Sequence, residues 1–213
     1  MRPVLAISGM KDSGKTTLCL ALASRLEEMG IKVGFVKRTH ESVLSGQGTD
    51  TGLLLGKGTP AILWGTDGIR AEDAGGEHNL EWMLDRFMPE ADLVLLEGGK
   101  GMPLPRVWVG SPSDCPDGTT GIFAWYDRKS RPVKTPSFTS GEEGELARFI
   151  AAKLAFSRPQ GGIGLFVDGR NVQLKPYLAN FLQGSIEAMV RPLKDTDGRN
   201  IYIHIRRGDP QSR

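Results

Sequence analysis

The chain has 213 residues, a length typical of one domain or of one domain with a small appendage. Its 27 basic and 25 acidic side chains leave a formal net charge of +2, which gives no indication of nucleic-acid binding. The two cysteines form neither a disulfide framework nor a metal-ligand spacing. No apolar run approaches the roughly 20 residues of a membrane helix, and the first predicted strand leaves no room for a signal peptide. We therefore expect a cytoplasmic protein without membrane contact.

The N-terminal segment predicts a βαβ unit. Residues 3–8 form an apolar run typical of a buried strand, and residues 17–29 predict a helix that ends at Gly30. Residues 32–37 predict the second strand, and the crossover between the strands should be right-handed. Between strand and helix, the sequence G-M-K-D-S-G-K-T matches the phosphate-binding pattern G-x-x-x-x-G-K-[ST] in the strand–loop–helix context that this pattern requires. We therefore predict a nucleotide-phosphate site.

The residue types of this loop explain the prediction. Gly9 and Gly14 permit backbone conformations in which several N–H groups converge on phosphate oxygens at a helix N-terminus. Lys15 supplies a positive charge for the β- and γ-phosphates, and the Thr16 hydroxyl is an oxygen ligand suited to Mg²⁺. The predicted nucleotide-binding residues of the loop are Gly9, Met10, Lys11, Asp12, Ser13, Gly14, Lys15, Thr16 and Thr17.

The middle of the chain continues the alternation of strands and helices. The strongest strand signal is the run at residues 91–98, whose apolar centre at 93–96 indicates a strand that lies mid-sheet and is covered on both faces. We predict further strands at residues 61–64, 105–109 and 121–125, a turn at residues 66–68, and helices at residues 50–58, 77–88 and 142–156. The fold class is therefore α/β, a P-loop NTPase-type, mostly parallel sheet with helices on both faces.

The composition changes after residue 157. Residues 157–162 predict a linker, residues 163–167 and 171–174 a hairpin with a turn at 168–169, residues 176–189 a helix, and residues 201–205 a last strand. We therefore expect a nucleotide-binding domain at residues 1–157 and a small α+β extension at residues 162–207. A segment of this size is small for an independent core, so it should pack on the main domain or on a partner chain.

Polar residues near predicted strand ends extend the candidate site. Lys37 and Arg38 follow the second strand and either contact the nucleotide or remain solvated cations. Asp50 lies near a predicted helix start, where Thr49, Asp50 or Thr51 can act as the N-cap, and the local sequence favours a cap over a metal role. Glu97 ends the apolar strand, and an acid at that position is favoured as a residue for Mg²⁺ or its water shell.

Four segments in the same order resemble the family of molybdopterin-guanine dinucleotide biosynthesis protein B, MobB. They are the P-loop, V-K-R-T-H at residues 36–40, G-T-D-T at residues 48–51, and D-L-V-L-L-E-G at residues 92–98, followed by Lys100 and P-L-P at residues 103–105. The resemblance covers roughly residues 1–156. It implies an accessory protein that binds GTP with Mg²⁺ and has weak GTPase activity. The implied partners are molybdopterin and the guanylyltransferase that attaches GMP to molybdopterin, and the implied oligomeric state is a homodimer.

The same resemblance implies roles for individual residues. Lys15, Asp50 and Glu97 become predicted catalytic residues, and Thr16, Asp50 and Glu97 become predicted metal residues, which overrides the cap for Asp50. Glu41 stands where many relatives have a second histidine. The chain contains no N-K-x-D guanine-reading motif, so the preference for guanine rests on the resemblance alone.

Two alternative functions remain open at this point. One is a non-catalytic adaptor or carrier of the pterin cofactor, with Lys37, Arg38, Lys100 and Arg106 as its anion-binding surface. The other is a P-loop small-molecule kinase, which would need an acceptor site and an arginine-bearing lid.

Overall fold

The computed structural model describes residues 3–75, 79–154, 162–167, 170–198 and 201–205. The chain separates into two compact units, Met1–Arg158 and Pro159–Arg213. Most of the predicted linker and the predicted turn at residues 168–169 lie outside the described residues.

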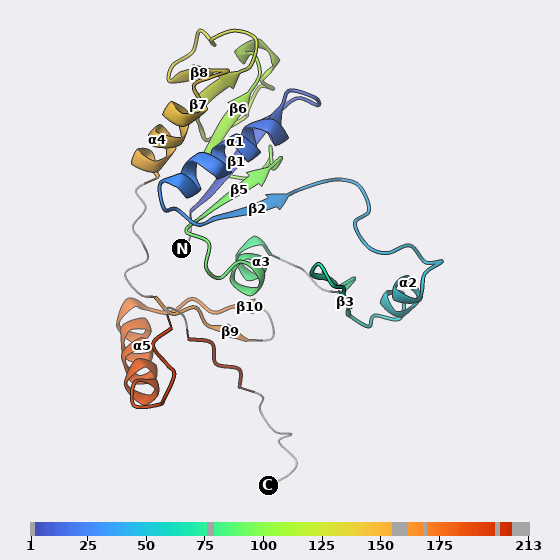
Figure 1. Ribbon diagram of the computed structural model, residues 1–213, viewed down its shortest axis with the longest axis vertical. Helices are drawn as coiled ribbons and strands as arrows, with labels where there is room; N and C mark the ends of the chain where they lie inside the picture. Colours follow the sequence, from blue (N-terminus) through green and yellow to red (C-terminus); the bar gives the residue numbers. More distant parts are fainter. Residues whose placement is uncertain (1–2, 76–78, 155–161, 168–169, 199–200, 206–213) are drawn as a thin grey trace. The chain divides into compact units, whose positions relative to one another are not determined.

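A six-stranded sheet forms the first unit, and every neighbouring pair of its strands is parallel. The strand order is β2–β5–β1–β6–β7–β8, which confirms the α/β class (Figure 1). The strands are β1 (Val4–Gly9), β2 (Val33–Lys37), β5 (Leu93–Glu97), β6 (Arg106–Val109), β7 (Ile122–Asp127) and β8 (Ser137–Thr139). The sequence did not predict β8, because three residues are too short for a periodic signal.

Helices α1 (Lys15–Glu28) and α4 (Glu143–Lys153) cover one face of this sheet side by side (Figure 1). The side chains of Leu18, Leu22 and Leu26 recur at the spacing of one helix face and are buried against the sheet. Alternate residues of the strands, such as Leu5 and Ile7 of β1, pack against these helix side chains. The apolar core therefore lies between the sheet and the two helices.

The opposite face of the sheet is contacted by other segments. Helix α3 (Leu80–Phe87) begins at Asn79, whose side chain accepts a hydrogen bond from Trp82 N. Its C-cap residue Met88 packs against Gly34 of β2, where an added Cβ would lie 2.8 Å from the Met88 sulfur. Elsewhere on this face, Leu96 approaches Gly99, so the backbone after β5 folds back over its own strand.

A separate small element follows β2. Helix α2 (Asp50–Leu55) is capped by Thr49, which accepts a hydrogen bond from Gly52 N at 3.1 Å. Strands β3 (Ala61–Trp64) and β4 (Ile69–Glu72) form an antiparallel hairpin. The predicted turn forms, but the return strand β4 was missed because its alternating sequence Ile-Arg-Ala-Glu has few strand-forming residues.

The second unit contains the predicted hairpin, β9 (Phe166–Val167) with β10 (Arg170–Asn171), and helix α5 (Pro176–Val190). The predicted strand at residues 201–205 is wrong, since this segment is not in a strand. Its β-branched and aromatic residues favour extended backbone, but a strand also needs a neighbour for its hydrogen bonds, and the described residues place none beside it. Within the described part of the chain, no helix is both long and apolar enough to span a bilayer.

Candidate nucleotide-binding site

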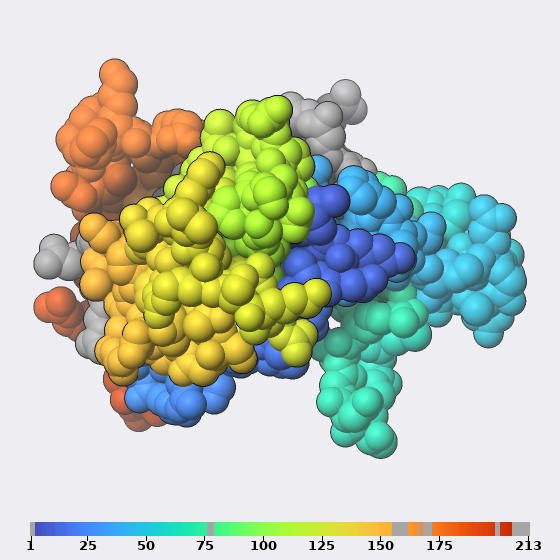
Figure 2. All heavy atoms as spheres, turned by 90° about the horizontal axis from the view of Figure 1, so that it is seen from above, coloured from blue at the N-terminus to red at the C-terminus, as the bar shows by residue number. Residues whose placement is uncertain are grey.

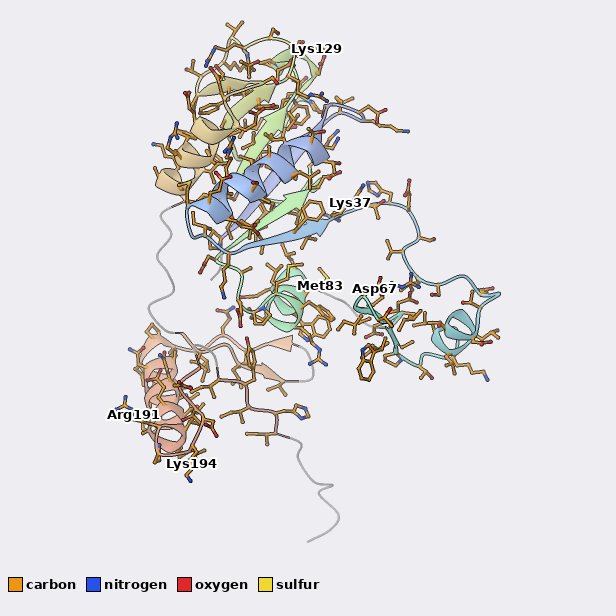
Figure 3. The ribbon with its side chains drawn as sticks, in the orientation of Figure 1. Lys37, Asp67, Met83, Lys129, Arg191 and Lys194 are labelled. Atoms are coloured by element: carbon orange, nitrogen blue, oxygen red, sulfur yellow. The ribbon has the colours of Figure 1, made fainter. Side chains whose placement is uncertain are left out.

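The parallel sheet brings five chain segments to one edge. Because all six strands run the same way, their carboxyl ends share that edge, which is where open α/β sheets bind ligands. The P-loop follows β1 there, Lys37 ends β2 (Figure 3), Glu97 ends β5, Gly110 follows β6 and Arg128 follows β7. Residues far apart in the sequence therefore surround the predicted phosphate site.

The P-loop adopts a conformation that favours glycine at two positions. Gly9 packs so closely that an added Cβ would lie 2.3 Å from the carbonyl oxygen of Val109. Gly14 has φ of 94°, and Asp12 has φ of 61°, both in the left-handed region. The loop thus turns twice between β1 and α1.

The N-terminus of α1 is open to an anion. Gly14 is its N-cap, so no side chain accepts a hydrogen bond from the first N–H groups, and the first turn carries no acidic residue. Free N–H groups and the helix dipole favour negative charge at this position. The buried Ser13 hydroxyl in the same loop also lacks a hydrogen-bond partner among the described residues.

Lys15 places a positive charge at the N-terminus of α1. Its Nζ donates a hydrogen bond to the Met10 carbonyl at 2.5 Å, so the side chain folds back along the loop. Burial lowers the pKa of Lys15 from its ordinary value, and the nearby ammonium of Lys100 lowers it further, while Glu97 partly offsets both. Bound phosphate would relieve this repulsion, because it places negative charge among the lysines.

Thr16 and Glu97 meet beside Lys15. The Thr16 hydroxyl donates to Glu97 Oε2 at 2.9 Å, and Lys37 Nζ lies 3.8 Å from Glu97 Oε1. The side chain of Glu97 is only 8% exposed, whereas that of Lys37 is 60% exposed. A hydroxyl and a carboxylate with oxygen donors are suited to Mg²⁺, so the predicted pair fits this metal chemically.

The remaining predicted residues are less tightly placed. Asp50 is the first residue of α2 and is exposed, and Thr49 rather than Asp50 is the N-cap. In the described ranges, no three His, Cys, Asp or Glu side chains form a metal-binding group, and Asp50 shares no hydrogen bond or ion pair with Thr16 or Glu97. Arg38 is exposed, and its backbone N donates to Glu97 O. Metal and nucleotide roles for Asp50 and Arg38 stay predictions.

Sequence reasoning misjudged Arg106. Its guanidinium is fully buried and donates to Ser8 Oγ at 3.1 Å and to the carbonyls of Thr120, Gly99 and Met102. Arg106 therefore cannot belong to an anion-binding surface, and burial lowers its pKa from the ordinary value. The available signal was a charged residue at the start of the otherwise apolar strand R-V-W-V.

Two other cations border the P-loop. Lys100 lies with its Nζ 3.6 Å from the Met10 sulfur and 5.6 Å from the centroid of the Trp108 ring. Arg128 lies against Gly14, where an added Cβ would be 2.6 Å from Arg128 Cδ. Arg128 was not among the predicted site residues, because its proximity to the loop depends on the pairing of β6 with β7.

Known proteins of similar sequence and structure identify the family of this chain. A protein of Methanocaldococcus jannaschii, named as a candidate molybdopterin-guanine dinucleotide biosynthesis adapter, is 25% identical over 231 residues, which cover 95% of this chain and 97% of that protein. The Haemophilus influenzae molybdopterin-guanine dinucleotide biosynthesis adapter protein is 29% identical over 109 residues, which cover 49% of this chain and 61% of its own length.

Solved structures share the fold. A crystal structure of molybdopterin-guanine biosynthesis protein B aligns with a TM-score of 0.57 at 24% identity over 70% of this chain and 98% of its own. A MobB homologue from Bacillus stearothermophilus aligns with a TM-score of 0.52 at 22% identity over 71% of this chain and 97% of its own. The family model of molybdopterin guanine dinucleotide synthesis protein B matches residues 4–116, which hold the P-loop and Glu97. The chain belongs to the MobB family of molybdopterin guanine dinucleotide synthesis proteins.

Proposed function

We propose that this chain binds GTP with Mg²⁺, hydrolyses it slowly, and acts as an accessory protein when GMP is attached to molybdopterin. Family membership and the adapter names of two relatives support the pathway. The open N-terminus of α1, with Lys15 beside it, supports the binding of phosphate.

The contact between Thr16 and Glu97 carries this proposal. It places a hydroxyl of the P-loop and a buried carboxylate from β5 within hydrogen-bond distance at the carboxyl edge. In P-loop proteins, these two positions serve the metal that accompanies the β- and γ-phosphates. We assign Thr16 and Glu97 to Mg²⁺, with Asp50 as a third predicted residue, and a bound metal would neutralise phosphate charge there.

The residues of the chain explain why hydrolysis would be slow. Water would attack the γ-phosphorus, the bond to the β–γ bridging oxygen would break, and the water proton would pass to a phosphate oxygen or to solvent. Lys15 stabilises the charge that develops on the leaving diphosphate. Lys37 and Lys100 would add positive charge, and among the described residues of the site no side chain stands out as a general base for the attacking water.

Nucleotide binding can be tested directly with one matched pair of variants. Lys15→Met should weaken GTP affinity at least tenfold, since it removes the ammonium at the phosphates. Lys32→Met is the control, because Lys32 pairs with Glu90 before β2, at the opposite edge of the sheet. Calorimetry with GTP, GDP and ATP, with and without Mg²⁺, also measures the preference for guanine. If the unaltered protein bound none of them, the proposal would fail.

An adaptor without required hydrolysis is the second candidate, and the names of the two relatives favour it. Cofactor maturation in cells that carry Lys15→Met separates the two functions. Normal maturation with this variant would establish an adaptor, whereas loss of maturation with retained folding would establish a nucleotide-dependent role.

We also propose a homodimer, supported by the hairpin of β3 and β4. Trp64 lies opposite Ile69, and Ile62 lies opposite Ala71, so these four side chains share one face of the hairpin. All four are exposed, Trp64 at 88%. An isolated two-stranded hairpin with an apolar face is marginal in water, and a second copy would cover it.

The oligomeric state tests this dimer. Trp64→Glu should shift the mass measured by light scattering from two chains to one, because it places a charge in the proposed interface. Asp67→Lys is the control, since Asp67 lies in the hairpin turn rather than on the apolar face (Figure 3). A monomeric unaltered protein would refute the dimer and leave the nucleotide proposal unaffected.

A further inference from the structure

Arg128 lies directly against the P-loop. A Cβ added to Gly14 would be 2.6 Å from Arg128 Cδ and 3.2 Å from Nη1, so the side chain packs directly on the last glycine of the loop. Figure 2 shows yellow atoms of the segment after β7 beside the blue atoms of the N-terminal region. Across the described residues, no carboxylate forms an ion pair with Arg128.

The backbone on each side of Arg128 is fixed. The Asp127 carbonyl accepts a hydrogen bond from Thr139 Oγ1 at 2.8 Å, and Asp127 Oδ1 accepts one from Lys129 N at 2.9 Å. Further along the same segment, Arg131 donates to the Ser137 carbonyl at 2.6 Å. These contacts hold the base of the Arg128 side chain at the carboxyl edge of β7, so its position on Gly14 is built into the fold.

The charge at this position is unfavourable without an anion. Arg128 packs on Gly14 and Lys15 follows this glycine in the sequence, while the N-terminus of α1 adds the positive end of the helix dipole, so like charges gather at this position and repel one another. An anionic ligand shared by the loop and Arg128 would relieve this repulsion.

The strand order gives the ligand a direction along the sheet edge. Thr16, Glu97 and Lys37 gather where β1, β5 and β2 end, on one side of the P-loop. Arg128 follows β7, which lies on the other side of β1, beyond β6. If Thr16 and Glu97 hold Mg²⁺ at the β- and γ-phosphates, the α-phosphate and the nucleoside extend toward Arg128.

We propose that Arg128 is a nucleotide-binding residue that contacts the α-phosphate and the nucleoside, the part common to a nucleoside triphosphate and its diphosphate. Its guanidinium donates hydrogen bonds to phosphate oxygens, and its plane is suited to lie against a ribose or a base. The inference rests on the proposed nucleotide site and adds the orientation of the ligand in it.

The test compares triphosphate with diphosphate. Arg128→Ala should weaken the binding of GTP and of GDP by the same factor, about tenfold, since both carry the contacted groups. Arg128→Met keeps the aliphatic stem on Gly14 and removes the charge, and it should weaken both ligands similarly. Lys129→Ala is the matched control, because Lys129 is an exposed neighbour on the same loop (Figure 3) and should change affinity by less than about twofold.

Each result decides a separate point. Affinities of Arg128→Met equal to those of the unaltered protein would overturn the inference, because packing alone would then explain the contact. A loss for GTP with none for GDP would overturn the proposed orientation. If the unaltered protein bound neither nucleotide, the proposed function itself would fail. If the unaltered protein bound both nucleotides and Arg128→Met bound them equally well, only the inference about Arg128 would fail. Thermal unfolding of each variant confirms that the fold is retained.

Discussion

Replacement of Arg106 by methionine tests the polar network under the site. Methionine has a similar length and is apolar, so the buried space stays filled while the donors disappear. The carbonyls of Thr120, Gly99 and Met102 lose the guanidinium that donates to them, and Ser8 loses one of its two partners. The Met102 carbonyl keeps a donor in Leu104 N, and the Gly99 carbonyl keeps one in Met102 N. The variant therefore measures what a buried cation contributes when its partners are backbone carbonyls and a hydroxyl.

The expected loss follows from these contacts. Hydrogen bonds to a charged group stabilise a fold by about 1.5–3 kcal/mol each, and the gain from no longer burying a cation offsets most of their combined contribution, which leaves a loss of about 3 kcal/mol. In a chain of this size, each kcal/mol lowers Tm by roughly 2–4 °C, so Arg106→Met should unfold about 6–12 °C lower.

Scanning calorimetry measures the change, with Arg148→Met as the control. Arg148 is an exposed residue of α4, and its replacement should alter the unfolding free energy by less than about 0.5 kcal/mol. If Arg106→Met unfolded within about 2 °C of the unaltered protein, the reasoning would be refuted, because the carbonyls would not depend on the guanidinium.

Three further predictions use other contacts of the same domain. Glu97→Gln keeps an acceptor for Thr16 but removes the charge, so the enhancement of GTP affinity by Mg²⁺ should fall about tenfold; equal enhancement in titrations of both proteins would contradict the metal role. Burial, and after it the nearby Glu97, raises the pKa of the Cys19 thiol from 9.0 to about 12, so the folded protein keeps this thiol protonated. A thiol reagent at pH 8 should therefore label the half-buried Cys115 and spare Cys19 until denaturant is added. The contribution of this raised pKa to the free energy of unfolding is fully present below about pH 9 and is lost as the pH rises toward 12. Rapid labelling of Cys19 in the native protein would contradict the burial of its thiol. Gly144→Ala in α4 meets no atom within 4 Å and should stabilise the fold by about 0.5–1 kcal/mol, whereas Gly9→Ala meets Val109 O at 2.3 Å and should destabilise it; chemical denaturation of both variants checks the contrast.

Local sequence was sufficient for much of the fold. The buried strands β1 and β5 and the P-loop were predictable because their signals lie within short windows: an apolar run, or glycines and a lysine at fixed spacing. The prediction of a strand at residues 201–205 failed for the converse reason, since high strand propensity does not supply a partner strand. Strand β4 was missed because pairing, not composition, forms it.

The sequence by itself determined that this chain has a loop with the phosphate-binding pattern and a candidate acid at Glu97, and the order of its motifs pointed to the family. Only the tertiary structure brought Thr16 to Glu97 across 81 residues, buried Arg106 against Ser8 across 98 residues, and placed Arg128 on Gly14. The reason is that a parallel sheet aligns the carboxyl ends of strands that are distant in the chain, and the strand order that decides which ends are neighbours is a property of the packed core rather than of any local segment.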